Sequence, residues 1–235
     1  MAQLLHWDGV GEKIYEAGVD RGVLFPTTTG GAYGAGVAWN GLTAVNENPS
    51  GAEENKHYAD NIKYASILSA EDFGFTIEAF TSPKEFDACD GTADLATGVS
   101  ISQQSRKPFG FSYRTQLASD VADIGEGGSI IHLVYGCKAS PSGKDRSTIN
   151  ESPEPTTFSW EVTTTPVNVK DHKPTAHLQI NTKLVDADKL AAFEEILYGK
   201  AAVEADVDNG IEASDAVPAR LMLPDDVAAH FNSQG

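Results

Sequence analysis

Histidine is the residue type of this sequence best suited to hold a metal ion. The histidines are His6, His57, His132, His172, His177 and His230. No two of them have the HxH or HExxH spacing that brings two imidazoles to one zinc ion. His132 lies between Ile131 and Leu133, so we expect it in or beside the core of a sheet. His172 and His177 are five residues apart across a proline, and a metal role for them is the minor alternative. The spacing predicts no metal site.

Two further patterns resemble binding loops but lack the required residues. The glycine-rich residues 30–36 (GGAYGAG) lack the Lys-Ser/Thr ending of a phosphate-binding loop, and they precede a strand instead of following one. Residues 206–210 (DVDNG) resemble a calcium loop. With Gly210 at the sixth position, however, Ala205 and Val207 would have to be ligands. No GxSxG nucleophile elbow occurs, and nothing marks a carboxylate pair for glycoside chemistry. We therefore expect no cofactor and no enzymatic activity.

The two cysteines, Cys89 and Cys137, show no sign of redox or nucleophilic chemistry. Neither has a CxxC partner, and neither has the basic neighbours that would stabilise a thiolate. One disulfide between them is conceivable. We expect instead that both are reduced, half-buried, small apolar residues.

The charge balance argues against two classes of partner. The 235 residues include 17 Lys and Arg against 34 Asp and Glu, a formal net charge of -17. Lys and Arg are needed to bind the phosphates of nucleic acid or an anionic membrane surface. No stretch approaches the roughly 20 apolar residues of a membrane-spanning helix, and the N-terminus has no signal-peptide pattern. We expect a chain that is made in a cytoplasm and stays there until released, with an acidity that at the least keeps it soluble.

Most of the chain alternates apolar with polar or small residues, which predicts strands. The runs are residues 36–45, 62–68, 73–80, 109–117, 130–135, 156–165 and 176–184. In the fourth run, for example, Phe109, Phe111 and Tyr113 fall on one face. The gaps are rich in Gly, Pro, Asn, Asp and Ser, as turns require. The pattern predicts a mainly β fold, an antiparallel β-sandwich or barrel of about seven or more strands.

One α-helix is predicted to flank the sheet. Asp186 can cap a helix over residues 187–198, and Gly199 can end it. Its apolar stripe should pack on a sheet face and consists of Leu190, Phe193, Ile196 and Leu197. A second helical turn is possible at residues 83–88. After Gly199 we expect an exposed acidic connection at residues 201–217, a final strand at 218–223 and a short helical turn at 224–231.

Several stretches, taken in order, resemble the major tail tube proteins of siphophages, the phages with long non-contractile tails, that infect Gram-positive bacteria. They run from residue 23 to residue 199, and the residues beyond match less clearly. The stretches are GLTAVNE (41–47), NPSGAE (48–53), YADNIKY (58–64), IEAF (77–80), FDACDG (86–91), FSYRT (111–115), HLVYGC (132–137), STIN (147–150), FSWE (158–161), DADKL (186–190) and LYG (197–199). Each match is short, and the ordered set carries the resemblance.

The resemblance implies a structural virion protein without catalytic residues, cofactor or metal. Its subunits would form six-fold rings that stack into the tail tube through which the genome passes. It implies a long inter-strand loop at residues 46–61 that acts in ring stacking, with candidate residues Asn46, Glu47, Asn48, Glu53, Glu54, Lys56, His57 and Asp60. The partners implied are further copies of the chain and the tape measure, tail terminator and distal tail proteins. Double-stranded DNA would pass through without being bound, no membrane would be involved, and the subunits would assemble in the host cytoplasm into the tail of the virion.

Two readings of function stay open at the level of sequence. In the first, residues 1–235 form a single tail tube domain, with the loop at 46–61 and an acidic C-terminal extension at 200–235. The alternative is a soluble β-sandwich binding module, for example for carbohydrate, that uses exposed tryptophans. Trp39 and Trp160 lie in alternating runs and are expected in the core, whereas the segment around Trp7 has no predicted structure.

Overall fold

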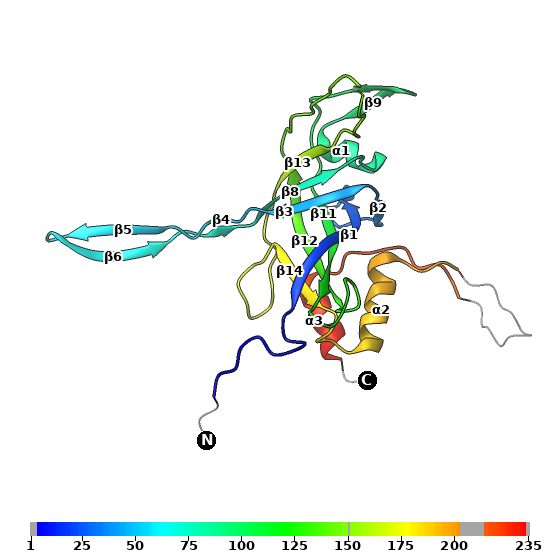
Figure 1. Cartoon of the computed structure of the whole chain (residues 1–235). Helices are drawn as coiled ribbons and strands as arrows, with labels where there is room; N and C mark the ends of the chain where they lie inside the picture. The colour runs from blue at the N-terminus through cyan, green and yellow to red at the C-terminus, as the bar shows by residue number, and fades with distance from the viewer. Residues whose placement is uncertain (1–3, 150, 203–213, 234–235) are drawn as a thin grey trace, which may run out of the picture.

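The computed structural model describes residues 4–149, 151–202 and 214–233, and its largest element is an antiparallel sheet of eight strands (Figure 1). The strands are β1 (Tyr15–Pro26), β2 (Val37–Trp39), β3 (Leu42–Glu47), β8 (Gly74–Ala79), β11 (Phe109–Ala118), β12 (Ser129–Ala139), β13 (Phe158–Thr163) and β14 (His177–Asn181). Their order is β2-β1-β11-β12-β13-β8-β3, with β14 paired to β12. The prediction of a mainly β, antiparallel fold is confirmed. The barrel alternative is wrong, because the two end strands, β2 and β3, do not pair with each other and the sheet stays open.

Strand β12 joins the two parts of the sheet. Its residues 129–137 pair with β11, residues 130–134 also pair with β14, and residues 138–139 pair with β13. Gly136 lies between the last two pairings with a φ of 59°. A Cβ there would come within 2.2 Å of the carbonyl oxygen of Thr165, so this position requires glycine.

The first core lies between the two parts of the sheet and is built from aromatic rings. Trp39 of β2 has its ring centroid 5.5 Å from that of Trp160 in β13 and 5.6 Å from that of Phe111 in β11. Trp39 and Trp160 are 3% and 1% exposed. The prediction that both lie in the core is therefore confirmed.

The second core lies on the other face of β1 and β12, under two helices (Figure 1). Helix α2 (Ala187–Tyr198) begins as predicted, because the Asp186 carboxylate accepts from the backbone N–H groups of Asp188 and Lys189. Phe193 and Leu197 are fully buried. The other two stripe residues, Leu190 and Ile196, are half-buried against the same core. Helix α3 (Pro224–Asn232) confirms the helical turn predicted at 224–231.

The C-terminal segment corrects one prediction. Residues 218–223 form no strand, because Pro218 has no N–H and the N–H of Arg220 donates to the carbonyl of Ile196 in α2. Leu221 and Met222 instead pack into the second core, where they are 4% and 6% exposed. The apolar run marks burial in this case and not strand pairing. The described residues exclude the whole DVDNG stretch at 206–210. They also exclude most of the acidic connection predicted at 201–217.

Cys137 lies in β12, whereas Cys89 lies in one of several short elements near the first core. These elements are the 3-10 helix η1 (Lys84–Phe86), α1 (Asp87–Asp90), β9 (Ala93–Ala96) and β10 (Val99–Ile101), and the first two confirm the helical turn predicted at 83–88. Cys89 and Cys137 are both free thiols with no exposed surface, so the expectation of half-burial is wrong. Burial raises the pKa of the Cys89 thiol to about 11 and also raises that of Cys137. Neither thiol is therefore ionised at neutral pH.

Two strand predictions change in the structure. Residues 36–45 form two strands, because Gly41, with a φ of 74°, turns the chain between β2 and β3. Residues 62–68 do form a strand, but it lies outside the main sheet, in a two-stranded arm (Figure 1). The strands of the arm are β4 (Ser50–Gly51), β5 (Glu54–Ala59), β6 (Ile62–Leu68) and β7 (Glu71–Asp72). Within the described ranges, no helix is long and apolar enough to cross a membrane.

Candidate assembly surface

The arm is a long β-hairpin that projects from the body of the molecule (Figure 1). β4 pairs with β7 next to the body, and β5 pairs with β6 farther out. Asp60 and Asn61 form the tip, with φ angles of 51° and 63°. Asp and Asn tolerate this left-handed conformation better than most residues, and two consecutive residues of this kind suit a tight hairpin turn. The predicted loop at 46–61 is therefore one half of a hairpin that continues to residue 72.

A backbone hydrogen bond anchors the arm to the body. The N–H of Asn48 donates to the carbonyl of Gly74 at 2.7 Å, which joins the arm to β8. Gly51, with a φ of 85°, lies so close to the opposite strand that a Cβ would come within 2.2 Å of the Ala70 carbonyl oxygen. Glycine permits this close approach, so Gly51 lets the two sides of the arm come together near the body.

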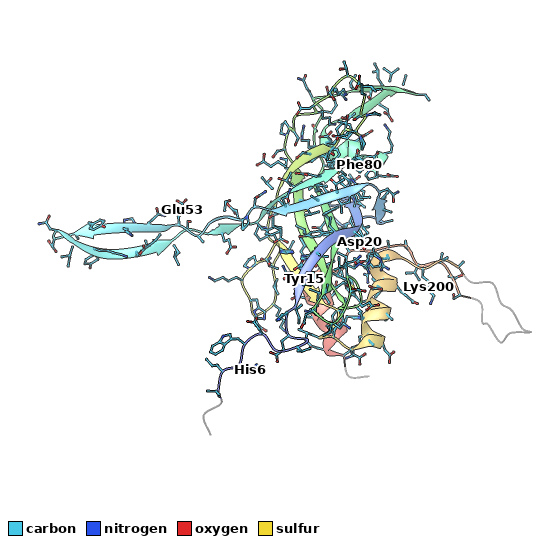
Figure 2. All side chains as sticks on the ribbon, viewed as in Figure 1. His6, Tyr15, Asp20, Glu53, Phe80 and Lys200 are labelled. Carbon is cyan, nitrogen blue, oxygen red and sulfur yellow. The ribbon has the colours of Figure 1, made fainter. Side chains whose placement is uncertain are left out.

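The structure places the residues predicted for ring stacking in three locations. Asn46 and Glu47 belong to β3 in the main sheet, opposite Thr76 and Phe75 of β8. Asn48 lies where the arm leaves the body. The remaining five lie on the arm itself and are Glu53, Glu54, Lys56, His57 and Asp60. Figure 2 labels Glu53, which lies between the short and the long strand of this half of the hairpin.

The surface of the arm is unusually apolar for a segment with no core of its own. Every residue from 48 to 72 is exposed except Ala65, which is half-buried. The large apolar side chains are Tyr58, Ile62, Tyr64, Ile67 and Leu68, each more than half exposed. The β5–β6 pairing shifts register at Tyr64, so Ile62 and Ile67 lie on one face of the arm and Leu68 lies on the other. An apolar patch of this kind marks an interaction surface.

Two other projections also expose large apolar residues. The N-terminal segment carries Leu4, Leu5, Trp7 and Val10, which are 71–92% exposed. This segment is tied to the body where the N–H of Gly11 donates to the Asp120 carboxylate. The β9–β10 hairpin exposes Leu95, Val99 and Ile101. In Figure 1 the arm, the N-terminal segment and this hairpin leave the body in different directions.

A cluster that the sequence did not predict lies where β3 leads into the arm. The His132 Nδ1 and His177 Nε2 atoms are 3.1 Å apart. The Glu47 carboxylate lies 3.7 Å from the first atom and 4.0 Å from the second, and it accepts a hydrogen bond from the Tyr113 hydroxyl at 2.6 Å. Burial lowers the pKa of His132 to about 4, and the charge of nearby His177 adds to this while Glu47 opposes it. Burial likewise lowers the pKa of His177. Among the described residues, Glu47, His132 and His177 are the only group of His, Cys, Asp or Glu that could hold a metal ion.

Sequence spacing misses this cluster because its members come from different strands. β12 and β14 pair with His132 opposite Gln179 and Val134 opposite His177, so the two histidines are diagonal neighbours. Both strands were predicted, but their pairing was not. The minor alternative that joined His172 to His177 selects the wrong partner, since His172 lies in an exposed loop.

Comparison with known proteins identifies no family. No family model matches the chain, and no curated protein sequence matches it. One solved chain that the comparison found belongs to a structure described as the "Cryo-EM structure of the anti-feeding prophage (AFP) baseplate, 6-fold symmetrised". That chain is 8% identical, the alignment covers 70% of the present chain and 95% of the other, and the TM-score is 0.34. A score this low does not carry over fold or function.

Proposed function

We propose that this chain is a structural subunit of a virion, which assembles with copies of itself into the tail tube of a long-tailed phage. The observation that carries the proposal is the arm, a projecting hairpin with five large apolar side chains exposed. The ordered sequence resemblance to siphophage tail tube proteins supports the same function and supplies the six-fold ring and the other tail proteins as expected partners.

The energetics of the arm favour a partner. A two-stranded hairpin in water is marginally stable on its own. Burying a large apolar side chain against a neighbour contributes about 1.5–3 kcal/mol, so several such residues on one hairpin would make a substantial contact. The arm projects to one side, so its natural contact is with a different surface of the next copy. A head-to-tail contact of this kind does not close on itself and generates a filament.

Open sheet edges and acidity fit the same proposal. β2 and β3 end the strand order, and edge strands offer backbone hydrogen bonds to neighbouring subunits. A wall built from subunits of formal charge -17 would repel DNA and deny it the counterion release that drives binding. DNA could then pass through without adhering.

The binding-module alternative loses two of its three candidate residues. Trp39 and Trp160 are buried and cannot form a carbohydrate platform. Trp7 is 73% exposed, but it lies on the N-terminal segment without a second exposed tryptophan. This alternative predicts a chain that stays monomeric at all concentrations.

Replacing the arm tests the proposal. A short Gly-Ser linker in place of residues 49–72 preserves the Asn48 to Gly74 hydrogen bond and removes all four arm strands together. We expect this variant to keep the thermal unfolding temperature of the body and to stay monomeric by sedimentation velocity under conditions where the intact chain polymerises. A variant that polymerises as well as the intact chain would show that the arm is not the stacking element.

A pair of arm variants tests which face is used. Changing Ile62 and Ile67 to Ser removes the large aliphatic residues of one face of the arm, whereas Leu68→Ser changes a residue of the opposite face and is the matched control. We expect the double variant to raise the concentration needed for assembly at least tenfold, and the control to raise it less. Equal effects would mean that both faces of the arm are in contact.

A further inference from the structure

The Glu47, His132 and His177 side chains meet at the root of the arm, from three strands that are distant in sequence. Glu47 is the last residue of β3, which leads into the arm. His132 lies within β12, and His177 begins β14. Phe73 follows β7, where the chain returns from the arm to the body, and its ring stacks on that of His177 with centroids 4.5 Å apart. A ligand bound here would connect the strand that carries the arm to the centre of the sheet.

The geometry of the three ligand atoms suits a metal ion. They are Glu47 Oε1, His132 Nδ1 and His177 Nε2, and the distances between them are 3.1, 3.7 and 4.0 Å. The point equidistant from the corners of this triangle lies about 2.1 Å from each, which is the length of a zinc bond to nitrogen or carboxylate oxygen. The two ring nitrogens face each other, so each imidazole would tilt toward Glu47 to direct its lone pair at the ion.

The surroundings support metal ligation by neutral imidazoles. A metal ion binds the neutral imidazole, whose ligating nitrogen carries a free lone pair. The second ring nitrogen of His132 lies 3.0 Å from the Thr115 hydroxyl, a typical partner for the outer nitrogen of a ligating histidine. The Tyr113 hydroxyl donates to Glu47 and orients its carboxylate.

We propose that Glu47, His132 and His177 form a binding site for a divalent transition metal ion of the zinc class. Two imidazoles and one carboxylate are a known ligand set for zinc with one further position open. That position would be filled from a groove beside His177, which is lined by Glu71, Phe73, Pro166, Pro174 and Thr175. The bound ion would fix β3 to β12 and β14 and so stabilise the root of the arm.

Metal titration of the full-length chain tests this site independently of assembly. Zn²⁺ binding is measured by calorimetry at neutral pH on monomeric protein, and Co²⁺ is added as a spectroscopic probe of the ligand set. We expect one high-affinity ion per chain, a Co²⁺ absorption spectrum of a four- or five-coordinate site, and an unfolding temperature that Zn²⁺ raises and EDTA returns to its starting value.

Matched variants decide whether the ion is in this cluster. Glu47→Gln and His177→Gln keep side-chain size and polarity, and each should weaken Zn²⁺ binding by about tenfold or more. His172→Gln changes an exposed histidine outside the cluster and should bind as the wild type does. No saturable binding to the wild type, or equal affinity in wild type and His177→Gln, would overturn the proposal and leave the cluster as a hydrogen bond between two neutral histidines. Circular dichroism of each variant identifies any loss that is due to unfolding.

Discussion

Asp20 is the most densely hydrogen-bonded carboxylate of the main sheet. Its two oxygens accept from Arg114 Nε and Nη2, each at 2.7 Å, and from the Gln116 amide at 2.8 Å. Figure 2 shows Asp20 on β1 in the body of the molecule. The hydrogen bond from Arg114 is the main cause that holds the pKa of Asp20 below its ordinary value. The Asp20 carboxylate therefore links β1 to β11 through charge-assisted hydrogen bonds.

Replacing this carboxylate should destabilise the protein in a pH-dependent way. Asp20→Asn leaves the partly buried Arg114 without a counter-charge, and we expect a loss on the order of 1–2 kcal/mol at pH 7, allowing for the exposure of the pair. Because the folded pKa is lowered, the contribution is complete above the unfolded pKa of about 3.9 and is lost as the pH falls through the folded value. The difference between wild type and variant in urea unfolding should thus shrink below pH 4.

A matched control separates this effect from surface charge. Glu195→Gln removes the exposed ion pair with Lys200, and we expect it to change stability by less than about 0.5 kcal/mol. A difference between wild type and Asp20→Asn that stays constant from pH 7 to pH 3 would contradict the assignment.

At the residue scale, sequence predicts burial better than it predicts contacts. The alternation correctly placed Trp39 and Trp160 in the core, since their own strands carry that information. The meeting of His132 with His177 depends on which strands pair, and that is set by the whole sheet. Gly136 is likewise required by a carbonyl that lies far along the chain.

At the scale of elements, helix α2 offers a direct test of packing. Leu197→Ala removes a fully buried side chain from the second core and should cost about 2–5 kcal/mol. Leu184→Ala makes the same chemical change at a position that is 84% exposed, and it should cost less than about 0.5 kcal/mol. Chemical denaturation of both variants measures the two losses, and similar values would rule out the packing of α2 on the sheet.

The elements also show where periodicity fails. Helix α2 was predicted because its cap, apolar stripe and terminal glycine agree. β1 was not predicted, because register shifts between Ala17 and Val19 and between Asp20 and Val23 interrupt its alternation. The sequence predicts the arm as two unrelated pieces, a loop at 46–61 and a strand at 62–68. The signal that could have identified it is Asp60-Asn61, a turn pair between two runs of strand-forming residues.

At the scale of the whole molecule, net charge should oppose assembly. Subunits with a formal charge of -17 repel one another, and the proposed contact is mainly apolar and backbone. Raising the salt from about 0.05 M to 0.5 M shortens the Debye length and should lower the concentration at which tubes form. Light scattering across a salt series measures this, and dissolution of tubes at high salt would show that ion pairs hold the contact instead.

The architecture of the whole chain was only partly within reach of the sequence. Composition and spacing predicted an antiparallel, mainly β fold, because strand number and turn residues are local properties. Whether the sheet closes depends on the long strand β12, which changes partners around Gly136. The proposed contact of the arm forms only between subunits. In the isolated chain the arm therefore shows only as exposed apolar surface.

Electron microscopy of the purified, concentrated chain tests the central claim most directly. The account predicts hollow tubes of stacked rings, in which a reconstruction places the arm at residues 48–72 against the neighbouring ring with Ile62 and Ile67 buried. Dispersed single subunits at every concentration and salt level, or an ordered assembly in which the arm stands free in solvent, would contradict it.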